Sequence, residues 1–549
     1  MSALFLLLSL FTPAPGAPAD LVLLGGRVLT QSTEQPEATA VAIQGRHIRA
    51  VGTDNELRRL VGPKTRVIDL AGRAVLPGLT DAHAHLVSLG QEREELDLRA
   101  LSSEREVGAR LAAYARAHPT GWLFGHAWDQ NRWTPATFPD RATLDAAAPG
   151  RAVVLSRVDG HAAWASSAAL AAAGISRVTR DPPGGRILRR ADGEPTGVLV
   201  DAAIALVDRA APGELDDAAL ERYILAAAEH CLSEGLVGVH DMGTSTRAAA
   251  VMRRLADASR LPIRVYAYFR ASEIDRVLAR PPERGASFFR TQGIKLFADG
   301  ALGSRGAALL APYSDDPGNT GLQMSSRAEI AAVARRARAA GYQITTHAIG
   351  DRGVRAVLDA YADALGPDAP RLDHRFRIEH AQVVAPEDRP RFARLGVIAS
   401  MQPTHATSDA PWAPARLGPA RMTGAYAWRT LARAGARLAF GSDFPVEAPS
   451  PLLGLYAATT RKDAAGATLA GLPADERLSL DQALQAYTTG AAYAAFAEAD
   501  RGRVVPGALA DLTVLDLTAA QAALLEPLRT ARVSMTIVGG KIRFERRQR

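Results

Sequence analysis

The middle of the chain alternates short apolar segments with helix-like stretches, and several apolar segments end on a histidine or an aspartate. The apolar segments occur at 236–240, 294–297, 343–347, 377–380 and 438–443, and all but 294–297 end on a histidine or an aspartate. Strands that alternate with helices are typical of parallel βα units. In a (β/α)8 barrel the chemistry lies at the carboxyl ends of the strands, which makes these terminal residues site candidates. We therefore predict an α/β fold centred on a (β/α)8 TIM barrel.

The two ends of the chain differ from the middle. Residues 20–77 and 498–549 contain runs of four or five β-prone residues separated by glycines, which is typical of strands and hairpins. We expect both ends to pair into one small β-sandwich. The barrel would then comprise residues 78–90 and 221–497. Residues 91–220 interrupt the alternation and hold four of the six tryptophans, so we predict an insertion subdomain after the first barrel strand.

Residues 1–19 are predicted to be a leader. Residues 4–11 are apolar and uncharged, and Ala-Pro-Ala at 17–19 precedes Asp20. An apolar core followed by an Ala-x-Ala pattern is typical of a secretory signal peptide, although the basic n-region is missing. A disordered leader or a misplaced start is the alternative. We expect a periplasmic or secreted bacterial protein, otherwise a cytoplasmic one. The segment is too short to span a membrane, so no membrane partner is expected after its removal.

Charge and cysteine usage narrow the function classes. The 65 Lys and Arg exceed the 58 Asp and Glu by seven, but the excess forms no basic run, so nucleic acid is not an expected partner. Cys231 is the only cysteine, which excludes an intramolecular disulfide and a cysteine-based metal cluster. A small-molecule substrate is expected. Whether the protein is a homodimer is left open.

The strongest local signal is the pair His83 and His85. Side chains alternate between the two faces of a strand, so two histidines separated by one residue point the same way and can bind one metal. Neutral imidazoles suit Zn, Mn, Fe or Ni. His347, His380 and Asp443 each end or follow another apolar run. Any one of these residues fits a structural role, but together they predict a metal site.

Lys295 lies within an apolar strand, where an unpaired ammonium is costly to bury. Only four of the 65 cationic residues are lysines, so a lysine at this position suggests chemistry that requires a primary amine. Reaction with carbon dioxide would give a carbamate that bridges two metals. The alternative is a buried ion pair, for example with Asp299.

The chain resembles the amidohydrolase superfamily of metal-dependent hydrolases, and within it the branch that includes N-substituted formamide deformylase. The resemblance covers residues 20–545. It rests on these motifs: LPGLTDAHAH at 76–85, DGH at 159–161, KLFADGALGS at 295–304, HAIGD at 347–351, IEH at 378–380, MQP at 401–403, GSDFP at 441–445 and PGALAD at 506–511.

The resemblance implies a role for each of six residues. His83, His85 and Asp443 would bind the more buried metal, and His347 and His380 a second one, with Lys295 as the carboxylated bridge. The cofactor would be a divalent metal, with zinc expected, and one or two ions per chain. Asp443 would be the catalytic base.

Other residues are candidates for substrate contacts. His161 and His240 could bind substrate or orient carboxylates, and a structural role suits each equally well. Trp128, Gln402 and His405 could line the substrate site, although packing between insertion and barrel suits Trp128 better. Arg305 follows the lysine strand and could bind a substrate carboxylate.

These observations predict a hydrolase acting on a carbon–nitrogen bond other than a peptide bond. Metal-activated water would attack an amide or formamide-like carbonyl, and Asp443 would carry the proton. Cyclic amides, acyl-amino acids, dipeptides and esters are alternatives, because the same site can cleave several bond types. An inactive scaffold is the rival from another class, and it would be expected to have lost ligands.

Overall fold

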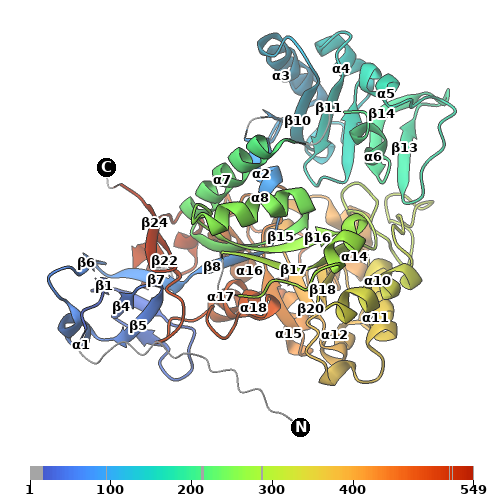
Figure 1. The fold of residues 1–549 in the computed structure, drawn as a ribbon. Coiled ribbons are helices and arrows are strands. Elements are labelled where there is room, and N and C mark those ends of the chain that lie inside the picture. The colour runs from blue at the N-terminus through green and yellow to red at the C-terminus, as the bar shows by residue number, and fades with distance from the viewer. Residues whose placement is uncertain are drawn as a thin grey trace.

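A computed structural model describes residues 17–93, 95–211, 215–285, 288–518, 520–521 and 524–547. The predicted leader at 1–19 therefore falls almost entirely outside the described residues. Three sheet-based parts are visible in Figure 1: a sandwich, a central barrel and an insertion that lies over one end of the barrel. Among the described helices, none has both the length and the apolar character needed to cross a membrane.

The centre of the molecule is an eight-stranded parallel sheet, which confirms the predicted barrel. Its neighbours follow chain order: β8 (Leu79–Ala84), β15 (Leu236–Thr244), β16 (Arg264–Arg270), β17 (Phe289–Phe297), β18 (Gln343–Ala348), β19 (Arg377–His380), β20 (Ile398–Met401) and β21 (Arg437–Phe440). The barrel closes just past β21, where Asp443 N donates to His83 O at 2.8 Å and His85 N donates to Phe444 O at 2.9 Å. Closure therefore brings the first and last strand ends together.

Helices cover the outside of the barrel (Figure 1). They are α2 (Leu86–Glu92), α7 (Asp217–Ser233), α8 (Thr246–Asp257), α9 (Ile274–Leu278), α10 (Arg327–Ala339), α11 (Asp351–Leu365), α12 (Arg389–Leu395), α14 (Ala413–Met422), α15 (Trp428–Arg433), α16 (Pro451–Thr460), α17 (Leu480–Tyr487) and α18 (Thr489–Ala494). The short helix α13 (Pro403–Asp409) directly follows β20 at the carboxyl end of the barrel. In α7, Asp216 caps the first turn by accepting from Ala219 N at 2.7 Å. Its buried face carries Ile224 and Cys231 at helical spacing, so Cys231 is the buried core residue that its apolar surroundings suggest.

Both ends of the chain contribute to the sandwich. One sheet contains β5 (His47–Gly52), β4 (Ala40–Gln44), β1 (Leu21–Leu24) and β6 (Arg66–Asp69), and short helix α1 (Asp54–Leu57) packs beside it. The other contains β24 (Lys541–Glu545), β23 (Val533–Val538), β22 (Leu512–Thr518), β7 (Arg73–Pro77), β2 (Arg27–Leu29) and β3 (Glu37–Ala38). Because β22 pairs with β7, the sandwich joins the two termini as predicted.

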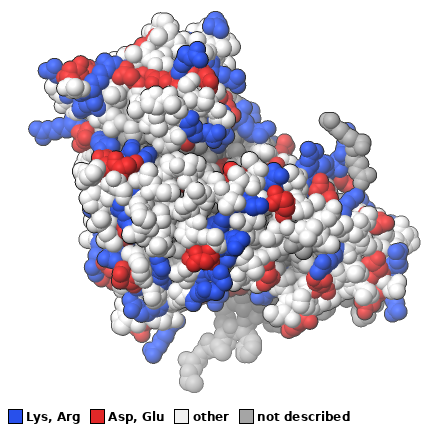
Figure 2. All heavy atoms as spheres, turned by 180° about the vertical axis from the view of Figure 1, so that it is seen from behind, with Lys and Arg blue, Asp and Glu red and all other residues white. Residues whose placement is uncertain are grey.

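The insertion has a sheet and a core of its own. Its strands are β9 (Leu96–Asp97), β10 (Leu123–Trp128), β11 (Val153–Arg157), β12 (Ala162–Ala165), β13 (Gly185–Arg189) and β14 (Pro195–Asp201). Its helices are α3 (Glu104–Ala117), α4 (Arg141–Ala147), α5 (Ser167–Ala172) and α6 (Ile204–Asp208). The tryptophan rings of Trp128, Trp133 and Trp164 pack against one another in this core. Over the face drawn in Figure 2, basic and acidic side chains are interspersed.

Candidate metal centre and substrate cavity

The six predicted metal-site residues meet at the carboxyl end of the barrel. They come from five strands or from the residues just after them: His83 and His85 at the end of β8, Lys295 in β17, His347 in β18, His380 at the end of β19, and Asp443 after β21. All are buried except His85, whose side chain is 29% exposed. Two of them need an unusual backbone, because φ is +71° at His380 and +62° at Asp443. Left-handed backbone at non-glycine residues is costly and is concentrated at functional sites.

Three side chains are arranged as a metal-binding group. One donor atom each from His83, His380 and Asp443 lies within 4.8 Å of the other two. His85 Nε2 is 3.0 Å from Asp443 Oδ1, and His83 Nε2 is 3.3 Å from the same oxygen. That oxygen is enclosed, and the two imidazoles are its neighbours among the described residues. Imidazole nitrogens gathered around an enclosed carboxylate oxygen are a donor set that suits Zn²⁺.

His347 lies beside this group rather than within it. Its ring centroid is 4.5 Å from that of His380, and its Nε2 is 3.4 Å from Gly300 O. Burial lowers the pKa of both rings well below the usual value and that of His83 to about 4. These histidines are therefore neutral at pH 7, which is the form that binds metals. The division of ligands between two metal positions stays a prediction.

Buried charges hold His83 in place. Its Nδ1 is 2.6 Å from Glu379 Oε2, and Arg377 Nε is 2.8 Å from the other oxygen of Glu379. The side chains of Arg377 and Glu379 are fully buried. Burial raises the pKa of Glu379, but the charges of Arg377 and His83 outweigh it and lower this pKa. A carboxylate that accepts from one ring nitrogen leaves the other nitrogen free to bind a metal.

Lys295 is buried within 3.4 Å of His83 Nε2. Burial lowers the pKa of its amine to about 8. The alternative partner, Asp299, does not pair with it among the described residues. Its carboxylate instead accepts the backbone N–H groups of Ala308, Ile349 and Gly350 at 2.8–3.0 Å. The buried ion pair with Asp299 is therefore not formed.

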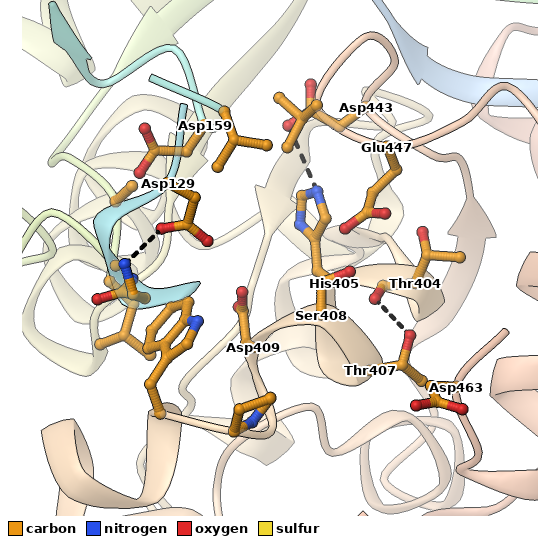
Figure 3. Close-up of a pocket in the computed structure, with 18 of the residues that line it drawn as sticks. Asp129, Asp159, Thr404, His405, Thr407, Ser408, Asp409, Asp443, Glu447 and Asp463 are labelled. Atoms are coloured by element: carbon orange, nitrogen blue, oxygen red, sulfur yellow. Dashed lines mark hydrogen bonds and ion pairs between the residues drawn. The ribbon is translucent and has the colours of Figure 1, made fainter. Parts of the chain in front are cut away.

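A cavity of about 780 Å³ opens above these residues, and His347, His380 and Asp443 lie in its lining. Figure 3 shows Asp443, Glu447 and His405 on one side and Asp129 and Asp159 of the insertion on the other. The barrel and the insertion thus face each other across the space that a substrate would occupy.

The cavity wall carries more carboxylates than free cations. Arg157 of the insertion lines it, but its guanidinium is held by Asp129 at 2.6 Å and Asp159 at 2.5 Å. Asp409 accepts from Gln382 and from a tyrosine hydroxyl, and burial raises its pKa to about 7. The lining therefore holds several hydrogen-bond acceptors, and the exposed Arg132 is a lining cation without an ion pair to a described residue.

Of the six predicted substrate-contact residues, two line the cavity and four do not. His161 and His405 line the cavity, and His405 Nε2 is 3.8 Å from Asp443 Oδ2. Gln402 lies behind the lining, where its Oε1 is 2.8 Å from His380 Nδ1. It orients a ligand candidate instead of meeting a substrate.

Three of these residues are placed away from the cavity. The His240 ring is fully buried and accepts from Arg377 at 2.8 Å. Trp128 lies in the insertion core, where its ring packs against Trp133 and Trp164. Its indole N–H donates to Leu155 O at 2.8 Å. Arg305 pairs with Asp315 at 3.1 Å. None of the three belongs to the cavity lining. His240 and Trp128 therefore take the structural alternatives named for them, and the expected contact of Arg305 with a substrate carboxylate is corrected.

Several residues around the site were not singled out from the sequence. Arg377 and Glu379 alternate on β19, and their spacing is a signal that both face the barrel interior. Arg157 and Asp129 of the insertion line the cavity, and Asp201 of the insertion lies behind its wall against His161, but no local pattern marks these positions. Only the folded arrangement brings them there.

Comparisons with known proteins agree with this geometry. The model of the amidohydrolase family matches residues 66–544. YtcJ of Bacillus subtilis (strain 168) is 34% identical over 95% of this chain and 99% of its own. N-substituted formamide deformylase of Arthrobacter pascens is 29% identical over 96% of this chain and 98% of its own.

Solved structures give the same result. An uncharacterised metal-dependent hydrolase from Pyrococcus horikoshii OT3 is 28% identical, with a TM-score of 0.74 over 90% of this chain and 97% of its own. A zinc-bound adenosine deaminase from Xanthomonas campestris, at 15% identity and a TM-score of 0.55 over 97% of this chain and 94% of its own, shares the fold. The family match covers most of the chain, and the chain belongs to the amidohydrolase family.

Proposed function

We propose that this protein hydrolyses an amide-like carbon–nitrogen bond with the help of a divalent metal, zinc being the expected ion. The observation that carries the proposal is the buried group of His83, His380 and Asp443, of which His380 and Asp443 line a substrate-sized cavity. The similarity to N-substituted formamide deformylase supports the bond type.

The ligands follow from the donor atoms. His83, His85 and Asp443 would hold one metal, and His347 and His380 a second. Lys295 would bridge the two after its neutral amine adds to carbon dioxide and releases a proton, which leaves a carbamate anion. Its lowered pKa makes the neutral amine available near neutral pH. A bound metal supplies a water of lowered pKa and polarises the substrate carbonyl.

The side chains of the chain itself move and place protons. Asp443 would accept the proton of the attacking water and deliver it to the leaving nitrogen. Glu379 keeps the Nδ1 proton of His83 between the two residues, so that His83 Nε2 keeps its lone pair. Gln402 orients His380 in the same way.

The cavity wall bears on the alternatives. Acyl-amino acids and dipeptides carry a carboxylate that needs an unpaired cation. Arg157 is already neutralised by Asp129 and Asp159, and Arg305 pairs with Asp315 outside the lining. Arg132, however, is exposed, lines the cavity and forms no ion pair with a described residue, so acyl-amino acids and dipeptides stay alternatives to neutral amides.

The first experiment is the metal content of the purified protein, wild type against Lys295→Ala, by elemental analysis. Two equivalents that fall to one or none support the bridged pair of metals. One equivalent that the substitution leaves unchanged removes Lys295 from the ligand set. No metal in either protein contradicts the proposal. Screening of formamides, acyl-amino acids and matched esters then tests the bond type, and turnover of none of them favours the inactive scaffold.

A further inference from the structure

One imidazole enters the cavity from the insertion instead of the barrel. His161 lies between β11 and β12, and its ring centroid is 4.9 Å from that of His347 and 6.3 Å from that of Phe297. Its side chain is 16% exposed and lines the cavity. Among the described residues nothing is bonded to its Nε2, so this nitrogen is available to a substrate held beside the metal ligands.

The ring is held from behind by Asp201. His161 Nδ1 is 2.6 Å from Asp201 Oδ1, and the carboxylate is fully buried. Asp201 N also donates to His161 O at 3.0 Å. A buried carboxylate at this distance retains the Nδ1 proton between the two groups, which leaves Nε2 as a hydrogen-bond acceptor.

The loop that follows the lysine strand fixes Asp201. A Cβ atom added at Gly300 or at Gly306 would lie 2.4 Å from Asp201 Oδ2. Only glycine therefore lets this barrel loop approach the carboxylate so closely. Asp201 thus joins the insertion to the barrel at the point where His161 enters the cavity.

We propose that His161 Nε2 accepts a hydrogen bond from the N–H of the scissile amide, with Asp201 as its positioning residue. The inference rests on the proposed function and adds a substrate class to it. The favoured substrates carry an N–H at the bond that is cleaved, as primary and secondary amides do. An ester presents an oxygen there, and this oxygen would face a lone pair of His161. Sites that bind a substrate N–H discriminate against analogues that lack it.

The test compares two substrates that differ only at this position, an N-aryl formamide and the matching aryl formate ester. Each is assayed with the metal-loaded wild type and with His161→Phe and Asp201→Asn. The control is His118→Phe, which changes an exposed histidine of the insertion. Burial lowers the pKa of His161 and Asp201 raises it, with a net increase, so assays at alkaline pH keep the ring neutral.

We expect the ratio of the amide kcat/KM to the ester kcat/KM to fall about tenfold in His161→Phe, the scale of one hydrogen bond. Asp201→Asn should lower the same ratio, because an amide can reverse the tautomer of the ring. The control should keep the wild-type ratio, and metal content should be unchanged in all variants. A merely structural role would lower both activities together.

An unchanged ratio overturns the inference, whether both activities fall equally or neither falls. In that case amide hydrolysis by the wild type still upholds the proposed function. If the metal-loaded wild type cleaves no amide of the screen, or only esters, the proposed function and the inference both fail.

Discussion

The barrel and the insertion form opposite walls of one cavity, but they hold their charged groups differently. On the barrel side, His83, Glu379 and Arg377 form a chain of contacts from which solvent is fully excluded. On the insertion side, Arg157 bridges Asp129 and Asp159, which remain about one-sixth exposed to the cavity. The barrel therefore fixes the geometry of the candidate metal ligands, whereas the insertion presents polar groups on the cavity wall.

The two walls also differ in what supports them. The core of the insertion is built from its own strands and tryptophans, and the barrel core is a separate cluster. Substitutions in one wall should consequently change one property of the site and leave the other intact. We expect metal binding to depend on the barrel side and substrate preference on the insertion side.

The largest effect that the comparison predicts is on the barrel side. Asp443→Asn keeps an oxygen near the metal position but cannot accept a proton. We expect kcat to fall by about 10²–10⁴-fold, the usual contribution of a general base. Steady-state kinetics with the best amide found by screening would measure it. Asp275→Asn, at a side chain that is 87% exposed, is the matched control, and equal activities of the two variants would contradict the role of Asp443.

A smaller effect is expected at Glu379, which does not line the cavity but contacts His83. Glu379→Gln leaves Arg377 buried without its carboxylate and weakens the orientation of His83. Loss of such a ligand-orienting group lowers metal affinity by about 10–100-fold, which competition with a chelator would measure. Glu387→Gln, at a side chain that is 75% exposed, should bind metal as the wild type does. If Glu379→Gln also binds metal with wild-type affinity, the buried carboxylate is not needed to orient His83.

The pH dependence of metal loading tests Lys295. Below its pKa of about 8 the amine is an ammonium and cannot add to carbon dioxide, whereas above it the amine is free. Loading of metal-stripped protein at constant dissolved carbon dioxide should therefore accelerate with rising pH, by about tenfold per unit below the pKa, and level off above it. The rise should disappear in carbon-dioxide-free buffer. A rate that does not vary with pH would mean that loading does not require the free amine.

The sequence predicts the barrel side of the site far better than the insertion side. His83, His347 and His380 could be found because each ends an apolar run, and the carboxyl ends of parallel barrel strands converge. Lys295 stood out because a buried lysine is costly. Arg377 and Glu379 are separated by one residue, as His83 and His85 are. The contacts that give them a role, however, are made between different strands, and spacing along one strand does not reveal them.

On the insertion side the local pattern contains little information. His161 could be named as a candidate, but Asp201, forty residues later in the chain, has no signal of its own. Their contact depends on how β14 lies against the loop before β12 and on the glycines of a barrel loop. Trp128 illustrates the opposite case, in which a large aromatic near the site is a core residue. Tertiary packing, which local periodicity does not describe, decides both outcomes.

The smallest expected effect tests whether the two walls are separable. Trp128→Phe removes the hydrogen bond to Leu155 O and part of a fully buried ring, so it should destabilise the insertion by about 1–3 kcal/mol. Thermal unfolding should show an earlier transition, while metal content and the amide-to-ester ratio should match the wild type. Trp428→Phe, at a fully buried tryptophan of the barrel, gives the comparison on the other side. Loss of metal in Trp128→Phe would show that the insertion core supports the metal ligands, and the division of labour between the two walls would then be wrong.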